Sequence, residues 1–591
     1  MSKQAGLMAV TAAHLRIRHD VTTIMGVTSL ARKRTVRSRS AALLGLALLN
    51  LVSQAKAVAS ASDFDVERLR QDTKYLASDQ LGGRMPGTPQ AADAVEYIRA
   101  QMKRAGLEPG YHGRWIQDVP LVTLTPATSP VLEVTSDHGS LRLNQGSDVV
   151  VWTKTPKSLV SLHDSEMVFV GYGIVAPDAG WDDYKGADVR GKTVVMLVND
   201  PDWQSSDSTG PFGGKRLSYY GRYTYKFEEA ARHGANAALI IHRTDAAGYP
   251  FKVLVNTNAG PKVQIDDPSD PKDHASVEGW ISQSSAKDVF DLAGLDLEAQ
   301  MSNAGTREFH PVPMQLHASV TLKNTISKFK SENVVGILPG QSDPSEAFFF
   351  SAHWDHLGTC EPASLGHRIC NGAVDNASGV AGVLSLARSF ASSPKLRRSV
   401  LFIAFTGEEQ GLLGSAYYVK HPALPLSDTV GGINIDVMNV FGPTNDVMIL
   451  HPGLTTLEAP FIATATKQGR KLSPDAFPEQ GLYYRSDQLS FARAGVPTLF
   501  ASSGFQRRTT SNTGMTLAYY FQHVYHTPAD TFDPNWDWTG AIEDLEVYRA
   551  VGRAFASGGE RPTWLPGSEF GFPNSTRKPV TDVHKDLLPN L

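Results

Sequence analysis

The sequence predicts an α/β fold in which a mostly parallel β-sheet lies between layers of helices. Two short continuous apolar runs, at residues 348–350 and 400–405, are typical of strands buried on both faces of a parallel sheet. A helical pattern over residues 377–390 separates the two runs, as expected of a crossover between parallel strands. Ligands of open α/β sheets bind beyond the carboxyl ends of the strands, so we expect a functional site there.

Each apolar run ends in side chains suited to metal binding or proton transfer. His353 and Asp355 follow the first run, Glu408 and Glu409 follow the second, and Asp375 lies in a Gly/Asn-rich turn between them. Each residue alone has an ordinary explanation, because a single His after a strand or a Glu pair in a turn is commonly solvated. Clustered carboxylates at one sheet edge would repel one another unless a cation held them. The pattern therefore predicts a metal site.

Five motifs in order carry a resemblance to a known family. They are H-x-D-H-x-G from His353, x-D-N-A-S-G around Asp375, G-E-E ending at Glu409, N-x-D ending at Asp436, and Y-H-T-P-x-D from Tyr525. Together they resemble the co-catalytic di-zinc aminopeptidases, whose fold family also holds glutamate carboxypeptidase, glutaminyl cyclase and the transferrin receptor ectodomain. Five elements in the right order over about 180 residues are far more specific than any one of them.

The resemblance implies a zinc-dependent exopeptidase fold with two Zn²⁺ per chain. His353 and Asp436 would bind one zinc, Glu409 and His526 the other, and Asp375 would bridge both. Zn²⁺ accepts imidazole and carboxylate ligands, and paired metals in such sites lie about 3.5 Å apart. The family also implies a cis peptide bond after the bridging Asp375.

Three further residues receive roles from the same resemblance and its chemistry. Glu408 would act as general base and then as acid to the leaving amine. Asp355 would hydrogen-bond His353 from outside the metal ligands and fix its tautomer. Tyr525 would donate to the developing oxyanion. His356 is adjacent in sequence, but the family pattern favours His353 as the ligand.

The expected activity is that of an aminopeptidase, which hydrolyses peptides with a free N-terminus. A carboxypeptidase or a glutaminyl cyclase, which typically uses one zinc, would be alternatives on the same fold. A receptor or interaction module without catalysis is an alternative from a different class. All five ligand positions and Glu408 are present, which argues against that last alternative.

Residues 1–59 have the pattern of a secretory leader. A basic stretch at 32–39 precedes an apolar run of twelve residues at 41–52, and small residues at 57–61 offer cleavage sites. A helix of twelve residues cannot span a bilayer, so we expect a periplasmic or secreted protein without a stable membrane span. An uncleaved N-terminal anchor is the alternative. Residues 1–59 contain nine Lys and Arg but one acidic residue, so the remainder is acidic and a nucleic-acid partner is excluded.

The two cysteines of the chain, Cys360 and Cys370, both lie in the segment between His353 and Asp375. In an exported protein a close, even pair indicates a disulfide. A zinc site built on cysteines would need more ligands at shorter spacing.

The length of 591 residues predicts several domains, or one large domain with an insertion. Residues 60–139 would form the first part of the peptidase domain, with two amphipathic helices joined by the turn GGRMPGTP at 82–89, which we interpret as a connector. Residues 140–322 change to short β-like runs, and 225–241 resembles a protease-associated (PA) domain inserted in this family. Residues 323–558 would complete the catalytic domain, and 559–591 would form a Pro/Gly-rich tail.

Overall fold

A computed structural model of the chain describes residues 64–267, 274–360, 366–508 and 514–571. The leader predicted at residues 1–59, with its apolar run and cleavage sites, lies outside the described residues. So does most of the predicted tail, from residue 572 onward.

The central sheet confirms the predicted α/β fold. Its middle consists of β17 (Arg398–Phe405), β14 (Asp343–His353), β18 (Thr429–Asn434) and β21 (Thr498–Ser503), which pair in this order and all run parallel. Both predicted apolar runs lie in these strands, and their residues are buried. The carboxyl ends of the four strands therefore meet at one edge of the sheet.

The outer strands make the sheet mixed. On one side β13 (Val312–Leu338) pairs antiparallel with β17, and β1 (Glu108–Pro109) and β2 (Ile116–Pro126) pair antiparallel with β13. On the other side β19 (Asp446–Ile449) pairs antiparallel with β21, and β20 (Lys471–Ser473) lies parallel to β19.

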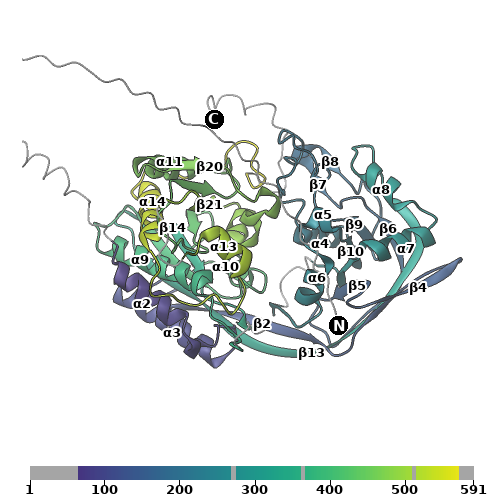
Figure 1. The fold of residues 1–591 in the computed structure, drawn as a ribbon, viewed down its shortest axis with the longest axis horizontal. Coiled ribbons are helices and arrows are strands. Elements are labelled where there is room, and N and C mark those ends of the chain that lie inside the picture. The colour runs from purple at the N-terminus through teal and green to yellow at the C-terminus, as the bar shows by residue number, and fades with distance from the viewer. Residues whose placement is uncertain (1–63, 268–273, 361–365, 509–513, 572–591) are drawn as a thin grey trace, which may run out of the picture. The chain divides into compact units, whose positions relative to one another are not determined.

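Helices cover both faces of this sheet (Figure 1). Alternate residues of β14 point to opposite faces, so Phe348 and Phe350 enter one core cluster and Phe349 enters another. The first cluster is completed by α2 (Val66–Leu76), α3 (Pro89–Arg104), α9 (Gly379–Ala391), α11 (Glu458–Lys467) and α14 (Thr539–Ala556). The second is completed by α10 (Leu413–Lys420) and α12 (Gln488–Arg493).

A second sheet with its own apolar cores occupies the middle of the sequence. Its strands are β3 (Val131–Ser136), β4 (Gly139–Asn144), β5 (Val149–Trp152), β6 (Leu159–Phe169), β9 (Thr193–Leu197), β10 (Ala237–Ile241) and β12 (Val277–Ile281). The helices α4 (Tyr223–Arg232), α7 (Gln283–Leu292) and α8 (Leu297–Ala304) pack with it. β3 already pairs in this sheet, ahead of residue 140. The predicted domain boundaries and the PA insert stay predictions.

The long strand β13 belongs to both sheets. Its residues 312–323 pair with β6, and its residues 324–338 pair with β2 and then β17. Figure 1 shows β13 and β2 running together along the molecule.

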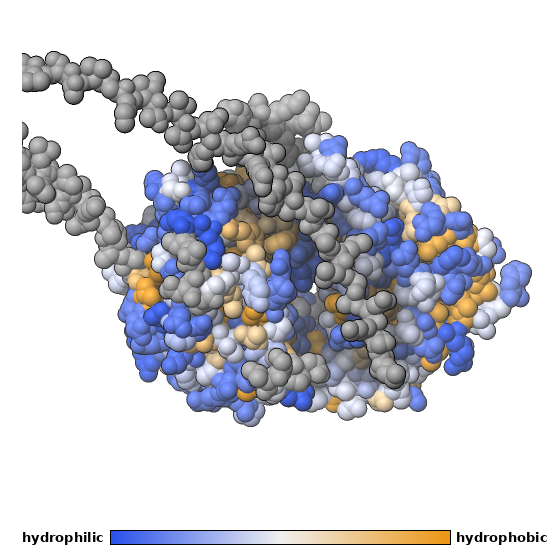
Figure 2. All heavy atoms as spheres, in the orientation of Figure 1, coloured by the Kyte–Doolittle hydropathy of each residue, from blue (hydrophilic) through white to orange (hydrophobic). Residues whose placement is uncertain are grey.

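No helix in the described ranges combines the length and the apolar character that a bilayer crossing requires. Figure 2 shows hydrophilic residues over most of the face in view, with apolar residues in separate areas. Within the described part of the chain, the large apolar side chains with substantial exposure are Val66, Leu159, Val253, Tyr519 and Phe521.

Candidate metal centre

The predicted ligands come from loops at the carboxyl edge of the central sheet. His353 is the last residue of β14, Glu409 follows β17, and Asp436 follows β18 by two residues. Asp375 lies in a short turn just before α9, and His526 follows the short helix α13 (Leu517–His523). Parallel strands and their loops thus bring residues from five separate segments to one place.

The carboxylate of Asp375 lies between two groups of side chains. Its Oδ1 is 3.2 Å from Nε2 of His353, which is also 3.2 Å from Oδ1 of Asp436. Its Oδ2 is 3.1 Å from Nε2 of His526, which is also 3.2 Å from Oε2 of Glu409. Each group therefore offers one imidazole nitrogen, one carboxylate oxygen of its own and one oxygen of Asp375.

The donor atoms fit metal ions. Tetrahedral Zn²⁺ holds N and O ligands at about 2.0–2.1 Å, which places ligand atoms about 3.3 Å apart. The separations between the imidazole and carboxylate atoms match that spacing. Asp375 Oδ2, Glu409 Oε1 and His526 Nε2 are also buried without a hydrogen-bond partner among the described residues. Unsatisfied buried polar atoms are costly, and a cation shared by them would remove that cost.

His356, set aside on sequence grounds, lies inside the centre. It is fully buried, and its Nδ1 is 2.6 Å from Oε1 of Glu409 and 3.8 Å from Oδ2 of Asp375. Both atoms are buried, and neither has another hydrogen-bond partner among the described residues. His356, Asp375 and Glu409 therefore form a further group able to hold a metal ion. The signal in the sequence was its position, one residue after Asp355 beyond the strand.

The peptide bond between Asp375 and Asn376 is cis, as the resemblance implied. The side chain of Asn376 ties this turn to the loop after β18. Its Nδ2 donates to the carbonyl of Ile435 (2.9 Å), and its Oδ1 accepts from the N–H of Val437 (3.2 Å). These bonds connect the turn that carries Asp375 to the loop that carries Asp436.

Asp355 contacts His353, but not by the expected atoms. Nδ1 of His353 lies 3.1 Å from the backbone carbonyl oxygen of Asp355 and 3.8 Å from its carboxylate. The carboxylate instead accepts the N–H of Glu408 at 3.1 Å. Because a carbonyl oxygen can only accept, this contact keeps the proton of His353 on Nδ1 and leaves Nε2 free to bind a metal. The Asp355 side chain instead holds the loop after β17.

Glu408 belongs to none of the groups that could hold a metal, although it adjoins Glu409 in sequence. Its side chain is half-buried. Burial raises the pKa of the Glu408 carboxyl well above its usual range; nearby His353 lowers this pKa, and the Asp436 carboxylate raises it. Cations bound at the neighbouring ligands would draw this pKa down again, toward the range in which a carboxylate can accept a proton and return it.

Tyr525 stacks on the ring of His526, with the ring centroids 3.8 Å apart. Burial raises the pKa of its phenol well above the ordinary value, and the carboxylates of Asp375 and Glu409 raise it further. The phenol therefore stays protonated at neutral pH and can donate a hydrogen bond.

Asp530 binds the backbone of the turn that carries Asp375. The sequence did not reveal this role, although Asp530 ends the Y-H-T-P-x-D motif. Its two carboxylate oxygens accept the N–H groups of Val374 (2.9 Å) and Asp375 (3.1 Å). The hydroxyl of Tyr520 donates to the same carboxylate at 2.9 Å. These bonds hold the backbone of the turn that presents Asp375.

The predicted disulfide between Cys360 and Cys370 is confirmed. It joins the ends of a small hairpin made by β15 (Gly358–Thr359) and β16 (Ile369–Cys370), and the Cα atoms are 5.8 Å apart. The bond therefore closes the segment between His353 and Asp375.

We expect this disulfide to stabilise the fold. Replacing both Cys360 and Cys370 by Ser should lower the free energy of unfolding by about 2–3 kcal/mol. A cross-link that closes a loop of this size lowers the chain entropy of the unfolded state by about that amount, and the substitution restores it. Denaturant titration of the variant and of the reduced wild type should give the same shift. Two free thiols in the native, unreduced protein would contradict the bond.

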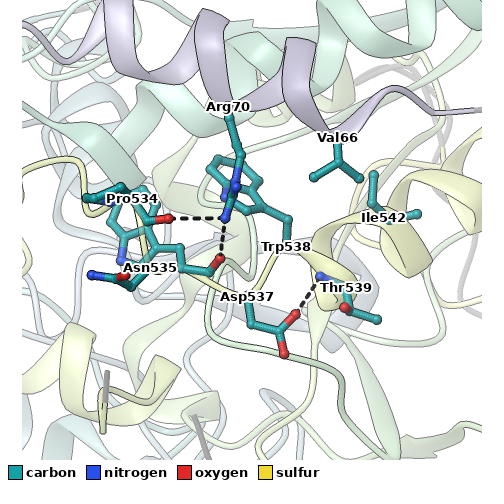
Figure 3. Close-up of a pocket in the computed structure, with 9 residues that line it drawn as sticks. Val66, Arg70, Pro534, Asn535, Asp537, Trp538, Thr539 and Ile542 are labelled. Carbon is teal, nitrogen blue, oxygen red and sulfur yellow. Dashed lines mark hydrogen bonds between the residues drawn. The ribbon is translucent and has the colours of Figure 1, made fainter. Parts of the chain in front are cut away.

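A separate pocket of about 580 Å³ is lined by residues of α2, of α14 and of the segment that precedes α14 (Figure 3). Arg70 of α2 donates there to the backbone carbonyls of Pro534 (3.1 Å) and Trp536 (3.2 Å). The carboxylate of Asp537 accepts the N–H of Thr539 at the start of α14. Its charged groups thus serve main-chain contacts, and the pocket contains none of the candidate ligands.

Comparisons with known proteins agree with the motifs. Residues 333–549, which include all five predicted ligands and Glu408, match the sequence profile of Peptidase family M28. A probable zinc metalloprotease of Pyrenophora teres f. teres is 44% identical over 105 residues, which are 18% of this chain and 22% of that protein. The probable glutamate carboxypeptidase VP8 of Zea mays is 24% identical over 384 residues, which are 60% of this chain and 48% of that protein.

Among solved structures, an aminopeptidase from Aneurinibacillus sp. strain AM-1 overlays with a TM-score of 0.46 and 18% sequence identity. The overlay covers 88% of this chain and 98% of that one. The chain spans between a fifth and a half of the length of the two relatives named above.

Proposed function

We propose that this chain is a two-zinc exopeptidase that removes N-terminal residues from peptides. The observation that carries the proposal is the placement of Asp375, whose two oxygens each lie 3.1–3.2 Å from a different imidazole nitrogen. One bridging carboxylate between two His–carboxylate pairs is the arrangement that two neighbouring zinc ions need. The match of residues 333–549 to Peptidase family M28 supports it.

The residues divide between the two metal positions. His353 and Asp436 would hold one zinc, His526 and Glu409 would hold the other, and Asp375 would contribute one oxygen to each. Bound zinc supplies Lewis acidity, which polarises a substrate carbonyl and makes water a better nucleophile near neutral pH. His356 lies close enough to Glu409 and Asp375 to support the second position.

The remaining groups of the site handle protons and charge. Glu408 would take a proton from the attacking water and deliver it to the leaving amine. The Tyr525 phenol, which stays protonated, would donate to the oxygen that gains negative charge during attack. Asp355 would hold the loop after β14 against the loop after β17, because its carboxylate accepts the N–H of Glu408.

One alternative has a specific observation in its favour. The relative that aligns over 60% of this chain is named a probable glutamate carboxypeptidase. A carboxypeptidase would use the same metals and the same base, and would differ in the end of the peptide that it recognises. A glutaminyl cyclase would differ in needing one zinc.

The deciding experiment presents three substrate sets to the purified chain. We expect hydrolysis of aminoacyl-anilides and peptides with a free N-terminus, and none of the same peptides after N-acetylation. Metal analysis should give close to two zinc equivalents per chain. Release of C-terminal residues from blocked peptides would favour the carboxypeptidase. Cyclisation of N-terminal Gln with one tight zinc would favour the cyclase, and no turnover with two bound zinc ions would favour a non-catalytic module.

We also propose that the mature protein is secreted or periplasmic. The disulfide supports this location, since such bonds persist in oxidising compartments. Fractionation of cells that express the full chain, with N-terminal sequencing of the mature protein, tests both the location and the cleavage site near residues 57–61. Protein that remains in the cytoplasm with its leader intact would contradict it.

A further inference from the structure

Arg84 is a buried cation next to the loops that carry the candidate metal ligands, although it lies far from those loops in the sequence. It lies in the turn 82–89 between α2 and α3, which the sequence indicated only as a connector. Its side chain is 1% exposed. A buried arginine requires partners for its donors, and here all the partners are main-chain carbonyl groups.

The guanidinium of Arg84 joins the two loops that carry metal ligands. Nε donates to the carbonyl of Trp354 (2.7 Å), which lies between His353 and Asp355. Nη2 donates to the carbonyl of Gly372 (2.9 Å), three residues before Asp375. Nη1 donates to the carbonyls of Asn371 and of Leu76, the last residue of α2. The planar fork therefore ties both ligand loops to the first helix.

The backbone of the same turn also packs closely against the segment between His353 and Asp375. The carbonyl of Gly83 accepts the N–H of Gly358 at 3.0 Å. A Cβ on Gly83 would lie 2.2 Å from the carbonyl oxygen of Gly358 and 2.6 Å from that of Cys370. Gly83 also has a φ of 74°, which favours glycine. The turn therefore approaches the hairpin closed by the disulfide too closely for any side chain at this position.

The charge of Arg84 faces the acidic centre. Burial lowers its pKa to about 10, while the carboxylates of Asp375, Asp530, Asp355 and Glu409 oppose that change. The guanidinium thus stays protonated at neutral pH and offsets part of the negative charge there.

We propose that Arg84 is a positioning residue that fixes the separation of the His353 and Asp375 loops and thereby sets the affinity of the site for its metal pair. The inference rests on the proposed two-zinc site and extends it to a residue outside the matched region 333–549. Donors that hold metal ligands from outside typically change metal affinity about 10–100-fold when they are removed. Arg84 acts on two ligand loops at once, so its effect belongs at the upper end of that range.

The test is Arg84→Lys, which keeps the charge and loses the fork. Zinc affinity, measured by competition with a chelator on the full chain, should fall about 10–100-fold. The visible spectrum of the Co²⁺-loaded protein, which reports ligand geometry, should change as well. A variant with wild-type zinc affinity and an unchanged Co²⁺ spectrum would overturn the proposal. If Arg84→Lys does not fold, Arg84→Gln is measured in the same way and judged by the same outcomes.

Arg470→Lys is the matched control. Arg470 is equally buried, pairs with Asp544 at 2.7 Å and donates to the hydroxyls of Ser503 (2.9 Å) and Thr444 (3.2 Å), and none of its hydrogen bonds reaches the His353 or Asp375 loop. It should lower the melting temperature and leave zinc affinity unchanged. An equal loss of zinc affinity in both variants would show that general destabilisation is the cause and overturn the inference. A wild-type chain that binds no zinc would instead contradict the proposed function.

Discussion

Replacing Glu408 by glutamine should lower kcat by about 10²–10⁴-fold while both zinc equivalents stay bound. Glutamine has nearly the same shape and can still hydrogen-bond, but its amide cannot accept a proton from the attacking water. The same group would also serve the leaving amine, so the upper end of the range is expected. KM should change little, because Glu408 belongs to none of the candidate metal groups and the five predicted ligands remain.

The neighbouring residue provides the control for this prediction. Glu409→Gln should weaken binding of one zinc and lose activity that excess zinc partly restores, since Glu409 lies 3.2 Å from the His526 nitrogen within its group. Steady-state kinetics and metal analysis of both variants separate the two roles. If Glu408→Gln emptied the site while Glu409→Gln left it filled, the assignments would be reversed. Near-full activity of Glu408→Gln would refute the hydrolytic mechanism.

Replacing Asp375 by alanine should remove both zinc ions and reduce activity to background. Its two oxygens lie 3.2 Å and 3.1 Å from the nitrogens of His353 and His526, so one substitution deprives both groups of an oxygen. The loss of affinity should exceed the roughly 10–100-fold typical of contacts outside the ligands. Equilibrium dialysis followed by metal analysis measures it directly.

Asp436→Asn provides a comparison for Asp375→Ala, because Asp436 would bind one zinc whereas Asp375 would bridge both. Asp436 contacts His353 alone among the imidazoles of the centre, so this variant should lose affinity at one metal position and keep about one equivalent. Circular dichroism of both variants checks that the fold is intact. If Asp375→Ala still bound one zinc as tightly as wild type, Asp375 would not bridge the two positions.

The sequence by itself predicted the sheet and most of the candidate ligands, because both depend on the order of residue types within short segments. Continuous apolar runs at 348–350 and 400–405 are required by burial on two faces, and the structure places both in parallel strands. Metal-binding side chains must follow such strands closely to reach the edge of the sheet. His353 and the Glu408–Glu409 pair therefore stood out without knowledge of any tertiary contact, whereas Asp436 and the choice of Glu409 as the ligand came from the resemblance to the di-zinc aminopeptidases.

Only the tertiary structure decided how those ligands are held. Arg84 reaches Trp354 and Gly372 across more than 250 residues of sequence, and Asp530 reaches the Asp375 turn across more than 150. The orientation of His353 by a main-chain oxygen leaves no trace in residue types. Contacts of this kind use backbone carbonyl and N–H groups, which every residue has, so side-chain spacing along the chain cannot reveal them.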